Sequence, residues 1–198
     1  MVRKLVAAGL GVGIALAFTA AITLRTGSPP QPSRAKPMQQ SAFQVPRPSV
    51  RVIDTTPVRL VIASIGVDAV IEARGLDANR NLATPTNFRN VAWYKLGPRP
   101  GEAGNAIING HVNWWTGDAV FTHLSRLKVG DQIRVVRADG VAVVFTVSAK
   151  RTVDANARVA SLFAPSSTST LTLITCSGVW NPLTQSDTQR LIVSASLA

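Results

Sequence analysis

The chain has 198 residues, 46% of them hydrophobic, and a formal net charge of +11 at pH 7. That apolar fraction is enough for the core of one folded domain with appendages, and the single cysteine excludes an internal disulfide. Residues 1–50 hold six basic and no acidic residues, so the remainder is only mildly basic. Because no dense Lys/Arg stripe or recognition-helix pattern is present, we expect no nucleic-acid partner. Attraction to an anionic cell envelope, or a merely solvated basic surface, accounts for the charge.

The N-terminus contains an uncharged apolar run, Leu5 to Leu24, preceded by Arg3 and Lys4 and followed by Arg25. As a helix this run would be about 30 Å long, which matches the hydrocarbon thickness of a bilayer. We therefore predict a transmembrane helix within an anchor at residues 1–25. A cleaved signal peptide is the rival, although its apolar region is usually about 7 to 15 residues long. The leading positive charges favour a cytoplasmic N-terminus, which predicts a single-pass cell-membrane protein with an extracellular folded domain.

A proline-rich stretch follows the anchor. Residues 26–49 contain six prolines and little apolar periodicity. Such linkers extend as semi-rigid polyproline segments at about 3.1 Å per residue. We predict a spacer here and a folded domain over residues 50–198.

The predicted domain contains at least seven short segments typical of β-strands, which are rich in β-branched residues and bounded by Gly, Pro, Asn or Asp. They are Val58 to Ala63, Val67 to Ala73, Ala106 to Asn109, Gln132 to Arg137, Val141 to Ser148, Leu171 to Cys176 and Arg190 to Ser194. Asp139-Gly140 predicts a hairpin turn between two of them. Strands in this number, without regular βαβ alternation, indicate an all-β barrel or sandwich.

Helical patterns are scarce within this domain. One helix is predicted to start at Asp118, which can cap it, and to end near Val129-Gly130. Its apolar stripe consists of Val120, Phe121, Leu124 and Leu127. A weaker helical turn is expected within residues 156–163. The prediction is therefore one or two short helices on a β-rich domain.

The only cysteine, Cys176, ends the alternating segment LTLITC. If Leu171 and Leu173 face the core, the two-residue period of a strand turns Cys176 to the other face. Ser177-Gly178 interrupts the pattern, so we expect the thiol at the last residue of a strand, beside a loop. A single cysteine in an exported chain is an intermolecular link, an inert buried thiol or a reactive nucleophile, and we favour the nucleophile.

A cysteine nucleophile needs a base, because an unperturbed thiol is only slightly ionised at neutral pH. Of the two histidines, His111 follows the apolar segment NAIING at a strand-to-loop junction. His123 lies instead within the predicted helix, where a surface or partly packed side chain is the ordinary case. We therefore select His111 over His123 as the candidate base.

Acyl transfer also needs donors for the oxyanion that forms. Arg190 starts the last predicted strand, and the connection from Cys176 is long enough to return an antiparallel neighbour to the same end of the sheet. We expect Arg190 beside the thiol, with a solvated edge arginine as the alternative.

Three motifs in this order resemble the sortases, the cysteine transpeptidases of Gram-positive bacterial surfaces. They are LTLITC at 171–176, NGH at 109–111 and QRLIV at 189–193. The segments IASIGVDAVIEARGL at 62–76 and GPRPGEAGNAIINGHV at 97–112 resemble the class F group of actinobacterial sortases most closely. The resemblance extends from about Val58 to Ser196.

The resemblance implies a closed eight-stranded β-barrel and a cysteine transpeptidase activity. Cys176 would attack the Thr-Gly bond of an LPxTG-like sorting signal and form a thioester. His111 would protonate the leaving amine and later deprotonate the incoming one, while Arg190 would position the substrate and bind the oxyanion. The implied partners are surface proteins that carry sorting signals and a cell-wall peptidoglycan precursor that supplies the acceptor amine. We predict no cofactor and no metal.

Two other functions are alternatives to this one. The L,D-transpeptidases also use cysteine and histidine, but ITCSGVW lacks the His and Arg of their compact nucleophile motif. A membrane-anchored, non-enzymatic envelope-binding domain with a structural cysteine is the remaining alternative. Native thiol labelling separates it from an enzyme.

Overall fold

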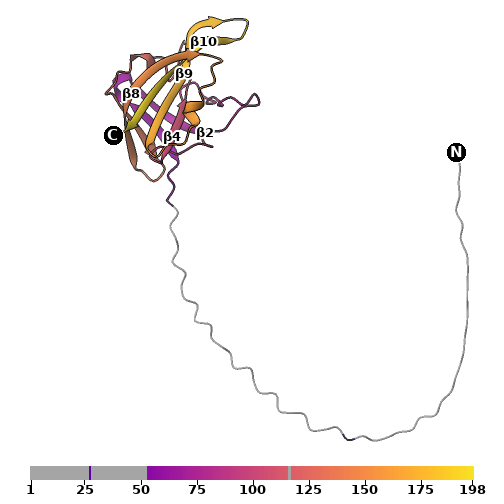
Figure 1. Ribbon diagram of the computed structural model, residues 1–198, viewed down its shortest axis with the longest axis vertical. Helices are drawn as coiled ribbons and strands as arrows, with labels where there is room; N and C mark the ends of the chain where they lie inside the picture. The colour runs from indigo at the N-terminus through magenta and orange to yellow at the C-terminus, as the bar shows by residue number, and fades with distance from the viewer. Residues whose placement is uncertain (1–26, 28–52, 116) are drawn as a thin grey trace, which may run out of the picture. The chain divides into compact units, whose positions relative to one another are not determined.

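The computed structural model describes Gly27, residues 53–115 and residues 117–198 (Figure 1). The predicted anchor at 1–25 lies outside these residues, as does the predicted spacer at 26–49 apart from Gly27. No helix within the described residues has both the length and the apolar character needed to cross a bilayer.

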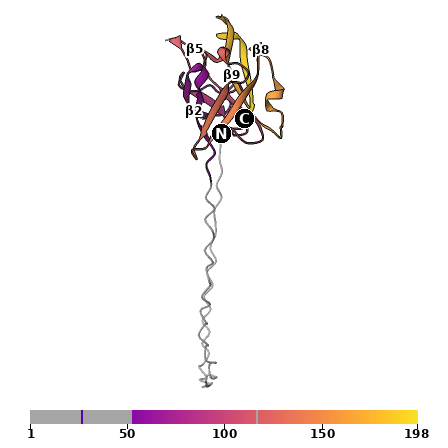
Figure 2. The same ribbon diagram turned by 90° about the vertical axis from the view of Figure 1, so that its left-hand side faces the viewer.

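Eight strands form a closed barrel, in the order β1-β2-β3-β4-β9-β10-β8-β7 (Figures 1 and 2). They are β1 (Pro57–Ile62), β2 (Val67–Arg74), β3 (Val91–Tyr94), β4 (Gly104–Asn109), β7 (Gln132–Arg137), β8 (Ala142–Asp154), β9 (Ser169–Asn181) and β10 (Ser186–Leu197). The predicted closed eight-stranded, all-β barrel is confirmed. Sequence analysis missed β3 and underestimated the length of β8, β9 and β10.

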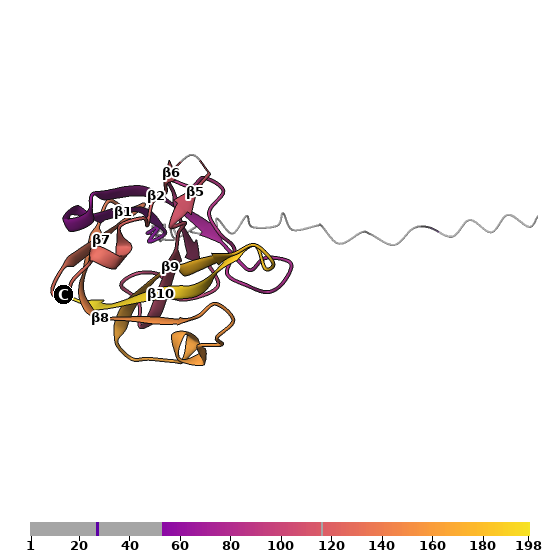
Figure 3. The same cartoon turned by 90° about the horizontal axis from the view of Figure 1, so that it is seen from above.

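Two very short strands, β5 (Asn113–Trp114) and β6 (Gly117–Asp118), pair outside the barrel as a separate small sheet. In the view from above, this hairpin lies on the side of β2, and the tip of the β9–β10 hairpin extends away from the barrel wall (Figure 3). Most neighbouring strands are antiparallel, but β2 pairs with β3 and β4 pairs with β9 in parallel. The parallel β4–β9 pair matters for the site, because the residues that follow the paired part of each strand lie at the same edge of the sheet.

Side chains that alternate along the strands fill the barrel interior. The fully buried ones include Leu60, Ile62, Ile108, Ile133, Val135, Phe145, Leu171, Leu173 and Val193. Burial of one such side chain stabilises a fold by about 1.5–3 kcal/mol, so this alternation is the main determinant of strand register.

The helix predicted from Asp118 is wrong. Asp118 belongs to β6, and the only helical part of this segment is the 3₁₀ helix η2 (Leu124–Arg126). The N–H of Phe121 donates to the carbonyl of His111 at 2.9 Å, and the N–H of Val120 donates to that of Phe88 at 3.0 Å, so neither is available for an α-helical ladder. The apolar stripe was read correctly, since Phe121, Leu124 and Leu127 are buried in the core.

The described residues contain two further 3₁₀ helices, η1 (Ala63–Ile65) and η3 (Ala160–Phe163). The second lies within the expected helical turn at 156–163. The predicted hairpin at Asp139-Gly140 is also confirmed: it joins β7 to β8, and Gly140 has φ +82°, in the left-handed region that glycine adopts without strain.

Candidate active site

Cys176 lies within β9, not at its end, which corrects the sequence prediction. The strand continues to Asn181 because a bulge absorbs the irregularity at Ser177-Gly178: β10 pairs Gln189 with Ser177 but Asp187 with Trp180. Gly178 has φ +88°, and a Cβ there would come within 2.5 Å of the Thr188 hydroxyl oxygen. Bulges of this kind bend a strand and redirect its side chains.

The first part of β9 is anchored in the barrel. Leu171, Leu173 and Thr175 are buried, whereas Cys176 is only partly buried. The Thr175 hydroxyl donates a hydrogen bond of 2.8 Å to the carbonyl of Gly110. This bond fixes the residue before Cys176 to the residue before His111.

His111 follows β4, which runs parallel to β9 with Asn109 opposite Ile174. The N–H of Gly110 donates to the carbonyl of Ile174 at 3.1 Å, which extends the parallel ladder beyond the strand. Counting on in this register brings His111 level with Cys176 on the neighbouring strand. The glycine is required here, since a Cβ on Gly110 would lie 2.8 Å from the side chains of both Val120 and Phe121.

An aromatic cluster lies on one side of His111. Its imidazole meets the Trp114 ring edge-to-face, with centroids 5.2 Å apart, and Trp114 stacks on Phe88 at 5.7 Å. Trp115 packs against Trp114 but is 89% exposed. These contacts restrict the imidazole on one side. His123, the rejected candidate, precedes η2 and lines a different pocket, together with Asp68 and Asp118.

Arg190 lies on β10 directly opposite Cys176 in the antiparallel pair. Its guanidinium donates to the backbone carbonyls of Asp187 and Gln189, at 3.0 and 2.8 Å, and to the Ser186 hydroxyl at 2.9 Å. These bonds hold the side chain at the base of the β9–β10 hairpin. Adjacent strands are about 4.8 Å apart, so Cys176 on β9 lies between Arg190 on β10 and His111, which follows β4.

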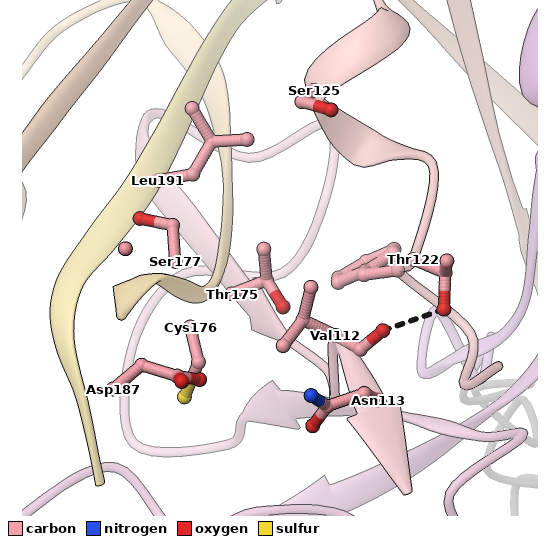
Figure 4. A pocket seen from close by; sticks show the side chains of 11 residues that line it. Val112, Asn113, Thr122, Ser125, Thr175, Cys176, Ser177, Asp187 and Leu191 are labelled. Atoms are coloured by element: carbon pink, nitrogen blue, oxygen red, sulfur yellow. Dashed lines mark hydrogen bonds between the residues drawn. The ribbon is translucent and has the colours of Figure 1, made fainter. Parts of the chain in front are cut away.

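A pocket of about 230 Å³ opens beside Cys176 (Figure 4). It is lined by Val112, Asn113, Phe121, Thr122, Ser125, Thr175, Cys176, Ser177, Gly178, Asp187 and Leu191. Of the three residues predicted from sequence, only Cys176 lines it. His111 and Arg190 each precede a lining residue, Val112 and Leu191, and so flank the pocket instead.

Sequence analysis missed the polar groups of this pocket. Asp187 stands three residues before Arg190, but only the bulge and the strand register bring it to the thiol. Asn113, Thr122 and Ser125 come from the segment that was expected to be loop and helix. The Ser177 hydroxyl oxygen is buried and has no hydrogen-bond partner within the described part of the chain.

The surroundings of Cys176 keep its thiol protonated. Burial raises the pKa of Cys176 above its ordinary value; the positive charge of Arg190 lowers this pKa, and the negative charge of Asp187 raises it further. Because burial dominates, the pKa lies above the ordinary value despite the arginine. The sulfur therefore needs a proton acceptor before it can attack a carbonyl.

Several solved structures are similar to this chain in fold. Sortase C-1 from Actinomyces oris is 25% identical, with a TM-score of 0.57, over 72% of this chain and 74% of its own. Sortase A from Corynebacterium diphtheriae, as a lid mutant, is 22% identical, with a TM-score of 0.57, over 75% of this chain and 73% of its own. Sortase C1 from Streptococcus agalactiae is 20% identical, with a TM-score of 0.56, over 71% of this chain and 66% of its own.

A search of curated proteins gave no match. The family profile described as "Sortase domain" matches residues 60–198, which is most of the chain and all of the barrel except the first three residues of β1. The chain belongs to the sortase family.

Proposed function

We propose that this sortase cleaves an LPxTG-like sorting signal between Thr and Gly and transfers the acyl group to a cell-wall amine. The supporting observation is the register of three neighbouring strands: Cys176 pairs with Arg190 on one side, and on the other side His111 comes two residues after Asn109, the partner of Ile174. A pocket opens at the same point, beside the sulfur.

In the first half-reaction, His111 accepts the thiol proton and the Cys176 sulfur attacks the threonine carbonyl carbon. The C–N bond to glycine breaks, and the leaving amine takes the proton from His111. In the second half-reaction, an incoming amine loses a proton to His111 and attacks the thioester carbonyl. The C–S bond breaks, and the sulfur regains a proton.

Arg190 has two tasks in this proposal. Its charge favours the thiolate, as the direction of its effect on the pKa of Cys176 indicates. Its guanidinium is also positioned by three oxygen acceptors close to the sulfur, so it can stabilise the oxyanion without reorganising.

The proposed setting is the outer face of the cell membrane. The uncharged run Leu5 to Leu24 serves as a single-pass anchor, and the proline-rich spacer carries the barrel into the cell wall. The acceptor is a peptidoglycan precursor amine, and the substrates are surface proteins with sorting signals. The segments at 62–76 and 97–112 support assignment to class F.

A non-enzymatic envelope-binding domain with a structural cysteine is not favoured. A core cysteine would occupy a position like those of Leu171 and Leu173, which are fully buried. Cys176 instead lies on the other face of β9 and lines a pocket.

The test is incubation of the protein with LPxTG-like peptides, with and without an amine acceptor, followed by chromatography of the products. We expect cleavage between Thr and Gly and a ligated product when the amine is present. Cys176→Ala should abolish both products. Full cleavage by Cys176→Ala would contradict the proposal.

A further inference from the structure

We infer that the Asp187 carboxylate binds the ammonium group of the incoming amine and holds it beside the thioester on Cys176. This inference rests on the proposed transfer to an amine and names the residue that recruits it. Asp187 and Cys176 line the same pocket and lie at the same end of it (Figure 4).

Asp187 is the only acidic side chain among the residues that line this pocket. The other ten lining residues are apolar groups, neutral hydroxyls, an amide, a glycine and the thiol. Arg190 flanks the pocket, and its guanidinium donates to two backbone carbonyls and to the Ser186 hydroxyl. Asp187 is thus the one acidic group that lines the pocket of a protein with a formal net charge of +11, and its carboxylate offers an ion-pair partner to an entering cation.

The carboxylate is not engaged elsewhere. The ion pairs among the described residues are Arg59–Asp68, Arg99–Glu102 and Arg137–Asp139. Arg190 hydrogen-bonds to the backbone carbonyl of Asp187, not to its side chain. Within the described part of the chain, the Asp187 side chain has neither a hydrogen bond nor an ion pair, so its oxygens are available to a ligand.

Asp187 opposes the first half-reaction, because its charge disfavours the thiolate. Its placement is therefore better explained by a step in which a positive charge enters the pocket. In the second half-reaction the nucleophile arrives largely as an ammonium ion, and a carboxylate near the thioester raises its local concentration.

The chemical step then balances as follows. The bound ammonium gives one proton to His111 and becomes a neutral amine. Its nitrogen attacks the thioester carbonyl carbon, the C–S bond breaks, and a C–N bond forms. The second proton lost by nitrogen passes to the sulfur, which restores the thiol. Asp187 touches the substrate in this step but takes no proton.

The experiment compares the wild type with Asp187→Asn, using an LPxTG-like peptide and two nucleophiles. Glycinamide is largely cationic at neutral pH, whereas hydroxylamine is uncharged. Asp154→Asn is the matched control, since it removes the same charge from an exposed position on β8 outside the pocket. Asp187→Glu tests rescue by a second carboxylate.

We expect Asp187→Asn to raise the KM for glycinamide by roughly three- to tenfold, as the loss of one partly exposed charge pair implies. The KM for hydroxylamine should be unchanged, and alkylation of Cys176 by iodoacetamide should become faster. Asp154→Asn should behave as the wild type, and Asp187→Glu should retain most of the affinity for glycinamide. Added salt should reduce the difference between wild type and Asp187→Asn.

An equal KM for glycinamide in the wild type and in Asp187→Asn would overturn the inference, as would an equal loss with hydroxylamine. Wild-type use of hydroxylamine but not glycinamide would also overturn it. If the wild type forms no acyl-enzyme at all, the proposed function fails instead, and the two failures are distinguishable.

Discussion

The two parts of β9 on either side of the Gly178 bulge differ in how they are held. Before the bulge, Leu171, Leu173 and Thr175 are buried, and β4 and β10 pair with the strand on both sides. Beyond it, β9 pairs only with β10, and Val179 and Trp180 are exposed. Cys176 lies at the boundary between these two parts.

This difference separates two requirements of a catalytic thiol. The barrel side of β9 holds the thiol rigidly, because a one-residue shift in the register of the strand would expose its core-facing side chains. The hairpin side supplies Asp187, whose placement depends on the bulge, and the Asp187 carbonyl and Ser186 hydroxyl that hold the guanidinium of Arg190. The comparison predicts that changes on the barrel side alter stability and geometry together, whereas changes in the hairpin charges alter the reactivity of the thiol.

The largest effect is expected at the end of β4. His111→Gln should lower the rate of peptide cleavage by about 10²- to 10⁴-fold, because it removes the proton acceptor that a protonated thiol needs. His123→Gln is the matched control and should leave the rate unchanged, since that residue lines another pocket. Steady-state cleavage of a fluorogenic peptide measures both. Equal losses in the two variants would contradict the assignment of the base.

Disrupting the bulge should cost both stability and activity. Gly178→Ala places a Cβ against the Thr188 hydroxyl at a residue with φ +88°, for a cost of about 2–3 kcal/mol. Gly140→Ala is the control: its φ is +82°, but nothing lies within 4 Å of the new Cβ.

Urea unfolding should rank Gly178→Ala below Gly140→Ala in stability, and only Gly178→Ala should lose peptide cleavage. Equal stability of the two variants would mean that the bulge is not held by the packing of Gly178 against β10.

Two buried threonines test the barrel side. Thr175→Val removes the hydroxyl that donates to the carbonyl of Gly110. Thr172→Val removes the hydroxyl that donates a hydrogen bond of 2.9 Å to the side-chain amide oxygen of Asn105. Each loss should cost about 1–2 kcal/mol of unfolding free energy. Only Thr175→Val should also slow catalysis, because its bond ties β9 to the residue before His111. An unaltered rate in Thr175→Val would show that this bond does not position the histidine.

The smallest effects should appear in the pH profile of thiol alkylation. Because burial raises the pKa of Cys176, the iodoacetamide rate should rise with a midpoint above that of the same chain unfolded in urea. Arg190→Met should shift the midpoint further upward and Asp187→Asn downward, since the first charge favours the thiolate and the second opposes it. A midpoint at or below that of the unfolded chain would contradict the proposed environment of the sulfur.

Much of the barrel could be predicted from local sequence patterns. Strands such as Gln132–Arg137 have a clear two-residue alternation, and Asp139-Gly140 has specific turn chemistry. β3 was missed because VAWY is short and is joined to its parallel neighbour β2 by a long connection. The helix from Asp118 was wrong because an apolar stripe at helical spacing also fits a segment whose backbone bonds go to other parts of the chain.

The site was predictable only in part, because some of its residues are brought together by pairing between distant strands. Cys176 and His111 stand out because their residue types are rare in this chain and each ends a stretch of largely apolar sequence. Asp187 has no such signal. Its position in the pocket depends on the bulge at Gly178, which shifts the register between β9 and β10 and cannot be read from either strand alone.

The most direct test of the central claim is intact-mass analysis of the protein after incubation with an LPxTG-like peptide, followed by proteolytic mapping of any adduct. We expect one acyl group, bound through a thioester to Cys176 and released by hydroxylamine. Peptide cleavage with the acyl group on another residue, or with no covalent intermediate under conditions that trap a thioester, would contradict it.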